Sequence, residues 1–193
     1  MLGVILCGGK SSRMGTDKGL LQLDSKTWAK TAFDKMTALQ VPVVLSVNDN
    51  QFNYYSSLFS PGQLIKDSGK LQVKGPLCGV LSVHLQYPSE DLMVLACDMP
   101  LLAPSMLGQL LNAHAHHAAQ SFFFTNAGNP EPLCAIYTAP GLSHIISLLN
   151  ANHLTRHSMK FVLEHLDTFS MPLKEDEKIY FRNFNAHAEL NGL

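Results

Sequence analysis

Apolar residues form short continuous runs that alternate with stretches of helical periodicity. The runs at 2–7, 43–47 and 92–97 are bounded by turn residues, which predicts strands buried on both faces. Between the first two runs, apolar residues recur on one face from Trp28 to Leu39, which predicts an amphipathic helix from about Lys26 to Gln40. Strand and helix therefore alternate as they do in βαβ units.

The rest of the chain continues this alternation and then departs from it. We expect a short strand at 64–66, helices at 77–86 and 104–119, strands at 121–125 and 133–137 around a turn-rich loop at 126–132, helices at 141–149 and 158–166, a strand at 168–173, an acidic turn at 175–177 and a last strand at 179–184. This order predicts a three-layer α/β fold with a mostly parallel central sheet. The length predicts one domain, 1–193.

The first predicted strand ends in a glycine loop that is rich in positive charge. Gly8 and Gly9 let the backbone turn sharply and expose N–H groups, which favour an anion. Three basic residues follow within a short distance, namely Lys10, Arg13 and Lys18. The segment therefore predicts a phosphate-binding loop that carries its own positive charges.

Spacing excludes two well-known phosphate loops. A P-loop needs Gly-Lys-Ser/Thr close after its first glycine, whereas Gly15 here precedes Thr16-Asp17-Lys18. The dinucleotide fingerprint G-x-G-x-x-G is absent as well, because the glycines stand at 8, 9, 15 and 19. A loop that only joined a strand to a helix would not need three cations, so we favour phosphate binding.

Polar residues follow three predicted strands at their C-terminal ends, where open α/β sheets bind ligands. Asn48 could read a base or a ribose there, or be only a turn residue. Asp67 begins a long loop to Pro76 that is either functional or purely connecting. Asp98 should lie beside the glycine loop, where Mg²⁺ is the natural partner of a buried acid near phosphate oxygens. The alternatives for Asp98 are a helix cap or a turn acid before Pro100.

Other polar clusters predict no metal site. The histidines at 114, 116 and 117 lack a nearby carboxylate partner, so we expect them to be solvated. His153 and His157 have i, i+4 spacing, but no general base stands between them as in a metalloprotease helix. Glu131 could contact an acceptor substrate or be solvated, and both interpretations stay open.

Composition narrows the class of protein. Hydrophobic residues make up 46% and charged residues 15%, which is typical of a compact folded protein. A net charge of −1 argues against a nucleic-acid-binding surface. The four cysteines form no C-x-x-C pair, so we expect reduced core thiols. The N-terminal apolar run is too short for a signal sequence or a membrane span, which favours a cytoplasmic location and no membrane partner.

The motifs resemble those of a known family in order and spacing. LCGGKSSRMGTDKG, SVNDN, IKD, GPLCG, ACDMP and NFN together are similar to molybdenum cofactor guanylyltransferases over nearly the whole chain. The glycine loop is shared with other nucleotidyltransferases, whereas RMG-x-DKG with GPL and CD-x-P points to the guanylyl branch. The resemblance implies a Rossmann-like nucleotidyltransferase fold and transfer of GMP from GTP to molybdopterin, with release of pyrophosphate.

The resemblance also implies roles for single residues. It assigns the following to nucleotide binding: Leu6, Cys7, Gly8, Gly9, Lys18, Asn48, Asp67, Asp98, Asn183 and Asn185. Lys18, Arg13 and Asp98 would act in catalysis, with Mg²⁺ on Asp98. Two departures stand out, because Cys7 replaces the usual Ala and Ala186-His187 replaces the usual Thr-Pro after the two asparagines. The second departure concerns the pterin side of the site.

GTP and molybdopterin are the expected substrates and Mg²⁺ the expected cofactor, with transient contact to proteins that deliver or accept the molybdenum cofactor. The alternatives are a cytidylyltransferase of the same cofactor, another small nucleotidyltransferase, or a GTP-binding protein without catalysis. A glycosyltransferase is disfavoured, because Asp98 is followed by Met99-Pro100 and not by the second acid of an Asp-x-Asp metal pair.

Overall fold

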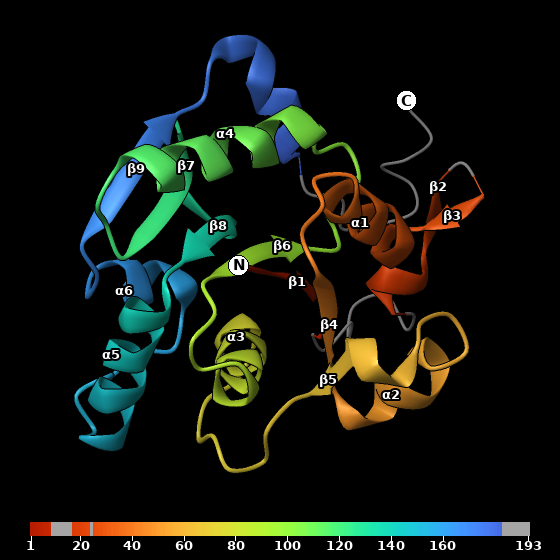
Figure 1. Ribbon diagram of the computed structural model, residues 1–193, viewed down its shortest axis with the longest axis horizontal. Coiled ribbons are helices and arrows are strands. Elements are labelled where there is room, and N and C mark those ends of the chain that lie inside the picture. Colours follow the sequence, from red (N-terminus) through yellow and green to blue (C-terminus); the bar gives the residue numbers. More distant parts are fainter. Residues whose placement is uncertain (9–16, 24, 183–193) are drawn as a thin grey trace.

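The computed structural model describes residues 1–8, 17–23 and 25–182 (Figure 1). Within these ranges, seven strands form one sheet in the order β5-β4-β1-β6-β8-β7-β9. Helices cover both faces of this sheet, so the predicted three-layer α/β fold is confirmed (Figure 1). None of the described helices is long and apolar enough to span a membrane.

The first half of the sheet is parallel. β1 (Leu2–Leu6) lies between β4 (Val43–Val47) and β6 (Leu92–Ala96), and β5 (Leu64–Lys66) forms the edge beside β4. Leu6 is in register with Ser46 on one side and with Ala96 on the other. The residues that follow these strands therefore emerge at the same edge of the sheet, as the alternation of strands and helices predicts.

The second half of the sheet is mixed. β8 (Asn129–Tyr137) runs antiparallel to both β6 and β7 (Ser121–Asn126), and β9 (Thr168–Pro172) is parallel to β7. The predicted loop at 126–132 is wrong, because β7 and β8 form a tight hairpin. Its two turn residues, Ala127 and Gly128, have φ of 48° and 79°, which a two-residue hairpin of the I′ type requires.

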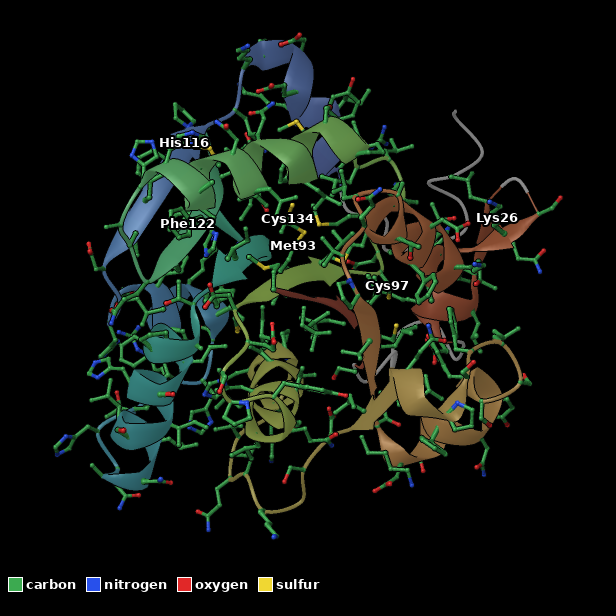
Figure 2. The ribbon with its side chains drawn as sticks, viewed as in Figure 1. Lys26, Met93, Cys97, His116, Phe122 and Cys134 are labelled. Atoms are coloured by element: carbon green, nitrogen blue, oxygen red, sulfur yellow. The ribbon has the colours of Figure 1, made fainter. Side chains whose placement is uncertain are left out.

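Alternate residues of the central strands face two separate cores. Ile5, Leu45 and Met93 pack under α1 (Trp28–Thr37) and α4 (Pro104–His116), whereas Val4, Val44 and Val94 pack under α3 (Pro76–Gln86), α5 (Ala139–Asn150) and α6 (Met159–Leu163). This period of two on strands with both faces covered explains the continuous apolar runs. Met93, Cys97 and Cys134 lie in the core beneath α1 and α4 (Figure 2). All four cysteines are free and buried, as expected.

Three predicted elements need correction. The predicted helix at 26–40 begins only at Trp28, because Lys26–Thr27 forms β3, which pairs with β2 (Gln22–Leu23). Asn48, for which a turn was one alternative, instead caps a further helix that was not predicted, α2 (Asp49–Tyr55). The predicted last strand is wrong, because η3 (Glu175–Phe181) is a 3₁₀ helix whose acidic first turn favours a helix start.

The histidines of α4 are not all solvated. His114 Nε2 lies 2.8 Å from Asp91 Oδ2, and Asp91 Oδ1 accepts a hydrogen bond from the Ala139 amide at 2.7 Å. Asp91 thereby connects the start of β6 to the last turn of α4 and to the first residue of α5. The expectation of a missing carboxylate failed because this partner is remote in sequence. His116 is exposed, as expected (Figure 2), and His117 stacks on Phe169.

Candidate functional site

The C-terminal ends of the parallel strands gather the predicted site residues. Gly8 follows β1, Asn48 follows β4 and Asp67 follows β5, and all three line one pocket of about 590 Å³. Its other wall is formed by Val73, Lys74 and Gly75 of the loop before α3 and by Cys78 in the first turn of α3. The long loop after Asp67 is thus part of a cavity wall. A nucleoside fits the size of such a pocket.

Lys18 and Asp98 form an ion pair at the same edge of the sheet, next to the end of β1. Asp98 follows β6, and the Cys97 amide donates to the Leu6 carbonyl, so the end of β6 is held against the end of β1. Lys18 Nζ lies 3.1 Å from Asp98 Oδ2, with 27% and 23% of the two side chains exposed. The sequence predicted Lys18 as a phosphate-binding residue and Asp98 as a ligand of Mg²⁺ and GTP, but it did not predict that the two side chains would pair with each other.

Asp17 is the residue that fixes the backbone next to Lys18. Its carboxylate accepts hydrogen bonds from the Gly19 amide at 2.9 Å, from Gln51 Nε2 at 2.7 Å and from the Tyr55 hydroxyl at 3.1 Å. Burial raises the pKa of Tyr55, which keeps this hydroxyl protonated and able to donate. A Cβ at Gly19 would collide with that hydroxyl, so only glycine fits there. Sequence reasoning missed Gln51 and Tyr55, because they stand on a helix that was not predicted.

Asn48 has a local structural task and also faces the pocket. The side-chain oxygen of Asn48 accepts a hydrogen bond from the backbone N–H of Gln51 at 3.1 Å. The backbone N–H of Asn48 donates to Gln51 Oε1 at 3.0 Å, and the two bonds form a capping box at the start of α2. The local task of the Asn48 side-chain oxygen is helix capping, and not the turn that was the alternative to base or ribose binding. Asn48 still lines the pocket with Gly8 and Asp67, so the two interpretations do not exclude each other.

Asp67 presents a half-buried carboxylate to the pocket. Its Oδ1 accepts from the Ser46 hydroxyl at 3.3 Å, and its backbone amide donates to the Val47 carbonyl at 2.9 Å. Burial raises the pKa of the Asp67 carboxyl, and the negative charge of Asp49 raises it further. The second oxygen, Oδ2, would be 3.6 Å from a Cβ at Gly8, so it faces the opening left by that glycine. A carboxylate held in this way suits a ligand that donates hydrogen bonds.

A lysine missed by the sequence supports the loop that follows Asp98. Lys35, on α1, donates from Nζ to the Pro100 carbonyl. Burial lowers the pKa of Lys35 to about 8. This contact holds the segment Asp98–Pro100 against α1.

Several predicted residues fall outside the described part of the chain. Gly9, Lys10 and Arg13 of the glycine loop, and Asn183 and Asn185 near the C-terminus, lie in the ranges 9–16 and 183–193. Within the described ranges, no group of three His, Cys, Asp or Glu side chains is placed to hold a metal. Asp98 supplies one oxygen-donor side chain of the type that Mg²⁺ prefers, and phosphate and water oxygens could complete such a shell.

Comparison with known proteins identifies the family of this chain. Residues 3–168 match the family model described as a MobA-like NTP transferase domain. A probable molybdenum cofactor guanylyltransferase of Flavobacterium johnsoniae is 29% identical, over 98% of this chain and 94% of that protein. A molybdenum cofactor guanylyltransferase of Campylobacter jejuni is 28% identical, over 96% and 91% of the two chains.

The fold has a close counterpart among solved structures. Molybdopterin-guanine dinucleotide biosynthesis protein A of Archaeoglobus fulgidus superposes with a TM-score of 0.78 at 22% identity, covering 100% of this chain and 96% of that one. This likeness confirms the nucleotidyltransferase fold. With the family match over most of its length, the chain belongs to the family of MobA-like NTP transferase domains and is a nucleotidyltransferase.

Proposed function

We propose that this protein transfers GMP from GTP to molybdopterin and releases pyrophosphate. The observation that carries the proposal is the placement of a paired Lys18 and Asp98 next to a pocket that ends in the Asp67 carboxylate. Nucleotide transfer needs a site for the phosphates next to a site for the nucleoside. The names of the full-length relatives supply the nucleotide and the acceptor.

The Asp67 carboxylate in the pocket favours guanine over adenine and cytosine on chemical grounds. The Watson–Crick edge of guanine carries two adjacent donors, N1–H and the N2 amino group, which match the two acceptors of a carboxylate. Adenine and cytosine each present an acceptor where guanine presents N1–H, and that acceptor would face the negative charge of Asp67. The Ser46 hydroxyl uses one lone pair of Oδ1 only, so both carboxylate oxygens keep acceptor capacity.

The residues next to the pocket would neutralise the negative charge of the GTP phosphates. Lys18 would hold the phosphates of GTP, with the Gly8 backbone in contact with the nucleotide and Arg13 assisting. Asp98 would hold Mg²⁺ together with phosphate oxygens, and the ion would offset charge on the α-phosphate and on the leaving group. A terminal phosphate oxygen of molybdopterin forms the new bond to the α-phosphorus, while the bond from that phosphorus to the β-phosphate oxygen breaks and pyrophosphate leaves. No covalent enzyme intermediate is needed, so positioning and charge stabilisation account for catalysis.

Pyrophosphate release tests this assignment directly. Purified protein is incubated with GTP, CTP or ATP, each with and without molybdopterin, and Mg²⁺. We expect release with GTP only, and only when the acceptor is present. A preference for CTP would make the protein a cytidylyltransferase of the same cofactor, and GTP binding without release under any condition would leave a nucleotide-binding protein without this activity.

Asp67→Asn should weaken the preference for GTP over ATP by about 10- to 100-fold, since a lost bidentate contact to a base is worth about 1–3 kcal/mol. The thermal midpoint should not fall, because burial disfavours the Asp67 charge and the amide removes that charge. The matched control is Asp49→Asn, which removes a charge from the exposed end of α2, where Asp49 pairs with Lys66 at 3.2 Å. Equal nucleotide preference in Asp67→Asn and wild type would place the base elsewhere.

A further inference from the structure

Gln51 is a buried polar residue to which neither the motifs nor the proposed reaction give a task. Only 7% of it is exposed, and it stands in the first turn of α2. Glutamine is seldom buried this completely unless its amide is satisfied. At Gln51 both ends of the amide are engaged, and the partners belong to three separate segments of the site.

The partners of Gln51 connect the proposed nucleoside site to the proposed phosphate site. Oε1 accepts from the Asn48 amide at 3.0 Å, at the rim of the pocket. Nε2 donates to the Cys7 carbonyl at 2.8 Å and to Asp17 Oδ2 at 2.7 Å. One side chain thus holds the end of β1, the start of α2 and the carboxylate that precedes Lys18.

Asp17 in turn fixes the backbone at Lys18. Its other oxygen accepts from the Gly19 amide, which makes Asp17 the N-cap of the 3₁₀ turn η1 (Lys18–Leu20). Lys18 lies in the first position of this turn, and its side chain reaches Asp98. A rotation of the Asp17 carboxylate would therefore change the direction in which the Lys18 side chain leaves the backbone.

We propose that Gln51 is a positioning residue that aims Lys18 at the nucleotide phosphates through Asp17. The inference rests on the proposed function in that it takes Lys18 to be the phosphate-binding cation. Gln51 itself does not touch substrate. It keeps Asp17 oriented, with Tyr55 as a second donor to the same carboxylate. The titratable groups of this network are Asp17 and Tyr55, with the Cys7 and Cys97 thiols next to Tyr55.

Gln51→Glu separates this task from helix capping. The glutamate keeps the size of the side chain and the acceptor for the Asn48 amide, but it turns the donor toward Cys7 and Asp17 into an anionic oxygen. We expect kcat for pyrophosphate release to fall about 10-fold or more, as for a displaced electrostatic group, with a smaller change in KM for GTP. The activity of Gln51→Glu relative to wild type should recover in part as the pH is lowered, since a protonated glutamate regains one of the two donors and a neighbouring carboxylate raises its pKa.

The chain offers a matched control. Gln63 stands in the same capping position of η2 (Pro61–Gln63), where its Oε1 accepts from the Ser60 amide at 3.1 Å. Gln63→Glu should leave kcat and its pH profile unchanged. Tyr55→Phe removes one donor to Asp17 without adding a charge, so a smaller loss of kcat is expected, and this variant tests the proposal even if Gln51→Glu fails to fold.

A double-mutant cycle with Lys18→Ala decides the proposal. If Gln51 acts through Lys18, then Gln51→Glu and Tyr55→Phe should cause little further loss in the Lys18→Ala background. Losses that multiply in this cycle would overturn the inference. A loss in Lys18→Ala together with wild-type kcat in Gln51→Glu and Tyr55→Phe would also overturn it and leave the proposed function standing. Wild-type turnover in Lys18→Ala would overturn the inference and remove Lys18 from the mechanism. Failure of the wild-type protein to release pyrophosphate from GTP with the acceptor would instead contradict the proposed function.

Discussion

Lys18→Ala is expected to lower kcat for pyrophosphate release about 10²-fold or more, the scale of one lost electrostatic donor in an active site. Lys18 is held at a defined place, because Asp17 caps its turn and Asp98 receives its ammonium group at 3.1 Å. The side chain is only partly exposed, so its charge is screened less than that of a surface lysine. Removal also leaves Asp98 without this counter-charge.

Lys26→Ala is the matched control for this loss. Lys26 also pairs with an aspartate, Asp34 at 2.8 Å, but 60% of its side chain is exposed. Exposed pairs of this kind contribute about 0–1 kcal/mol, so neither turnover nor stability should change measurably. Turnover of Lys18→Ala at the wild-type level, measured with saturating GTP and acceptor, would remove Lys18 from the mechanism.

Asp98→Asn is expected to reduce turnover to a similar degree and to raise the Mg²⁺ concentration needed for half-maximal activity. The substitution keeps the shape of the side chain but replaces an anionic oxygen donor with a neutral one, and Mg²⁺ prefers carboxylates. It also removes the negative partner of Lys18. Since the two residues are in contact, the losses in Lys18→Ala and Asp98→Asn should not be additive.

A Mg²⁺ titration of each variant makes this test specific. Asp34→Asn serves as the control, because Asp34 carries the same charge in an exposed pair with Lys26 and Lys30. Its Mg²⁺ dependence should match that of the wild type. An unchanged half-saturating Mg²⁺ concentration in Asp98→Asn would show that the ion does not depend on this carboxylate, even if turnover falls.

Much of the parallel half of the fold could be predicted from the chain. The runs at 43–47, 64–66 and 92–97 became strands with accurate bounds, because strands that are covered on both faces are mostly apolar and the runs end at turn-forming or charged residues. The second half was harder to predict. The hairpin at Ala127-Gly128 was predicted as a longer loop, since turn-forming residues extend on both sides of it. The segment 179–184 was predicted as a strand, but capping by Glu177 favours the 3₁₀ helix.

The site shows the same division. Gly8, Asn48 and Asp67 were predicted as nucleotide-binding residues, and they line one pocket. Asn183 and Asn185 stay predictions. No sequence motif predicts the contacts of Gln51, Tyr55 and Lys35, because a single glutamine, tyrosine or lysine in an amphipathic segment is compatible with many surroundings. The prediction for His114 was wrong for the same reason, since its partner Asp91 precedes β6 and is 23 residues away in the sequence.

The sequence by itself determined which residues end the buried strands, and hence that Gly8, the Asn48 amide and the carboxylates of Asp67 and Asp98 follow strands at one edge of the sheet. This follows from short-range rules of burial and chain direction. Only the tertiary structure decided that Lys18 pairs with Asp98 and that Gln51 links Asp17 to Cys7 and Asn48. Such contacts depend on how helices pack on the sheet. That packing depends on many side chains at once, and no spacing along the chain encodes it.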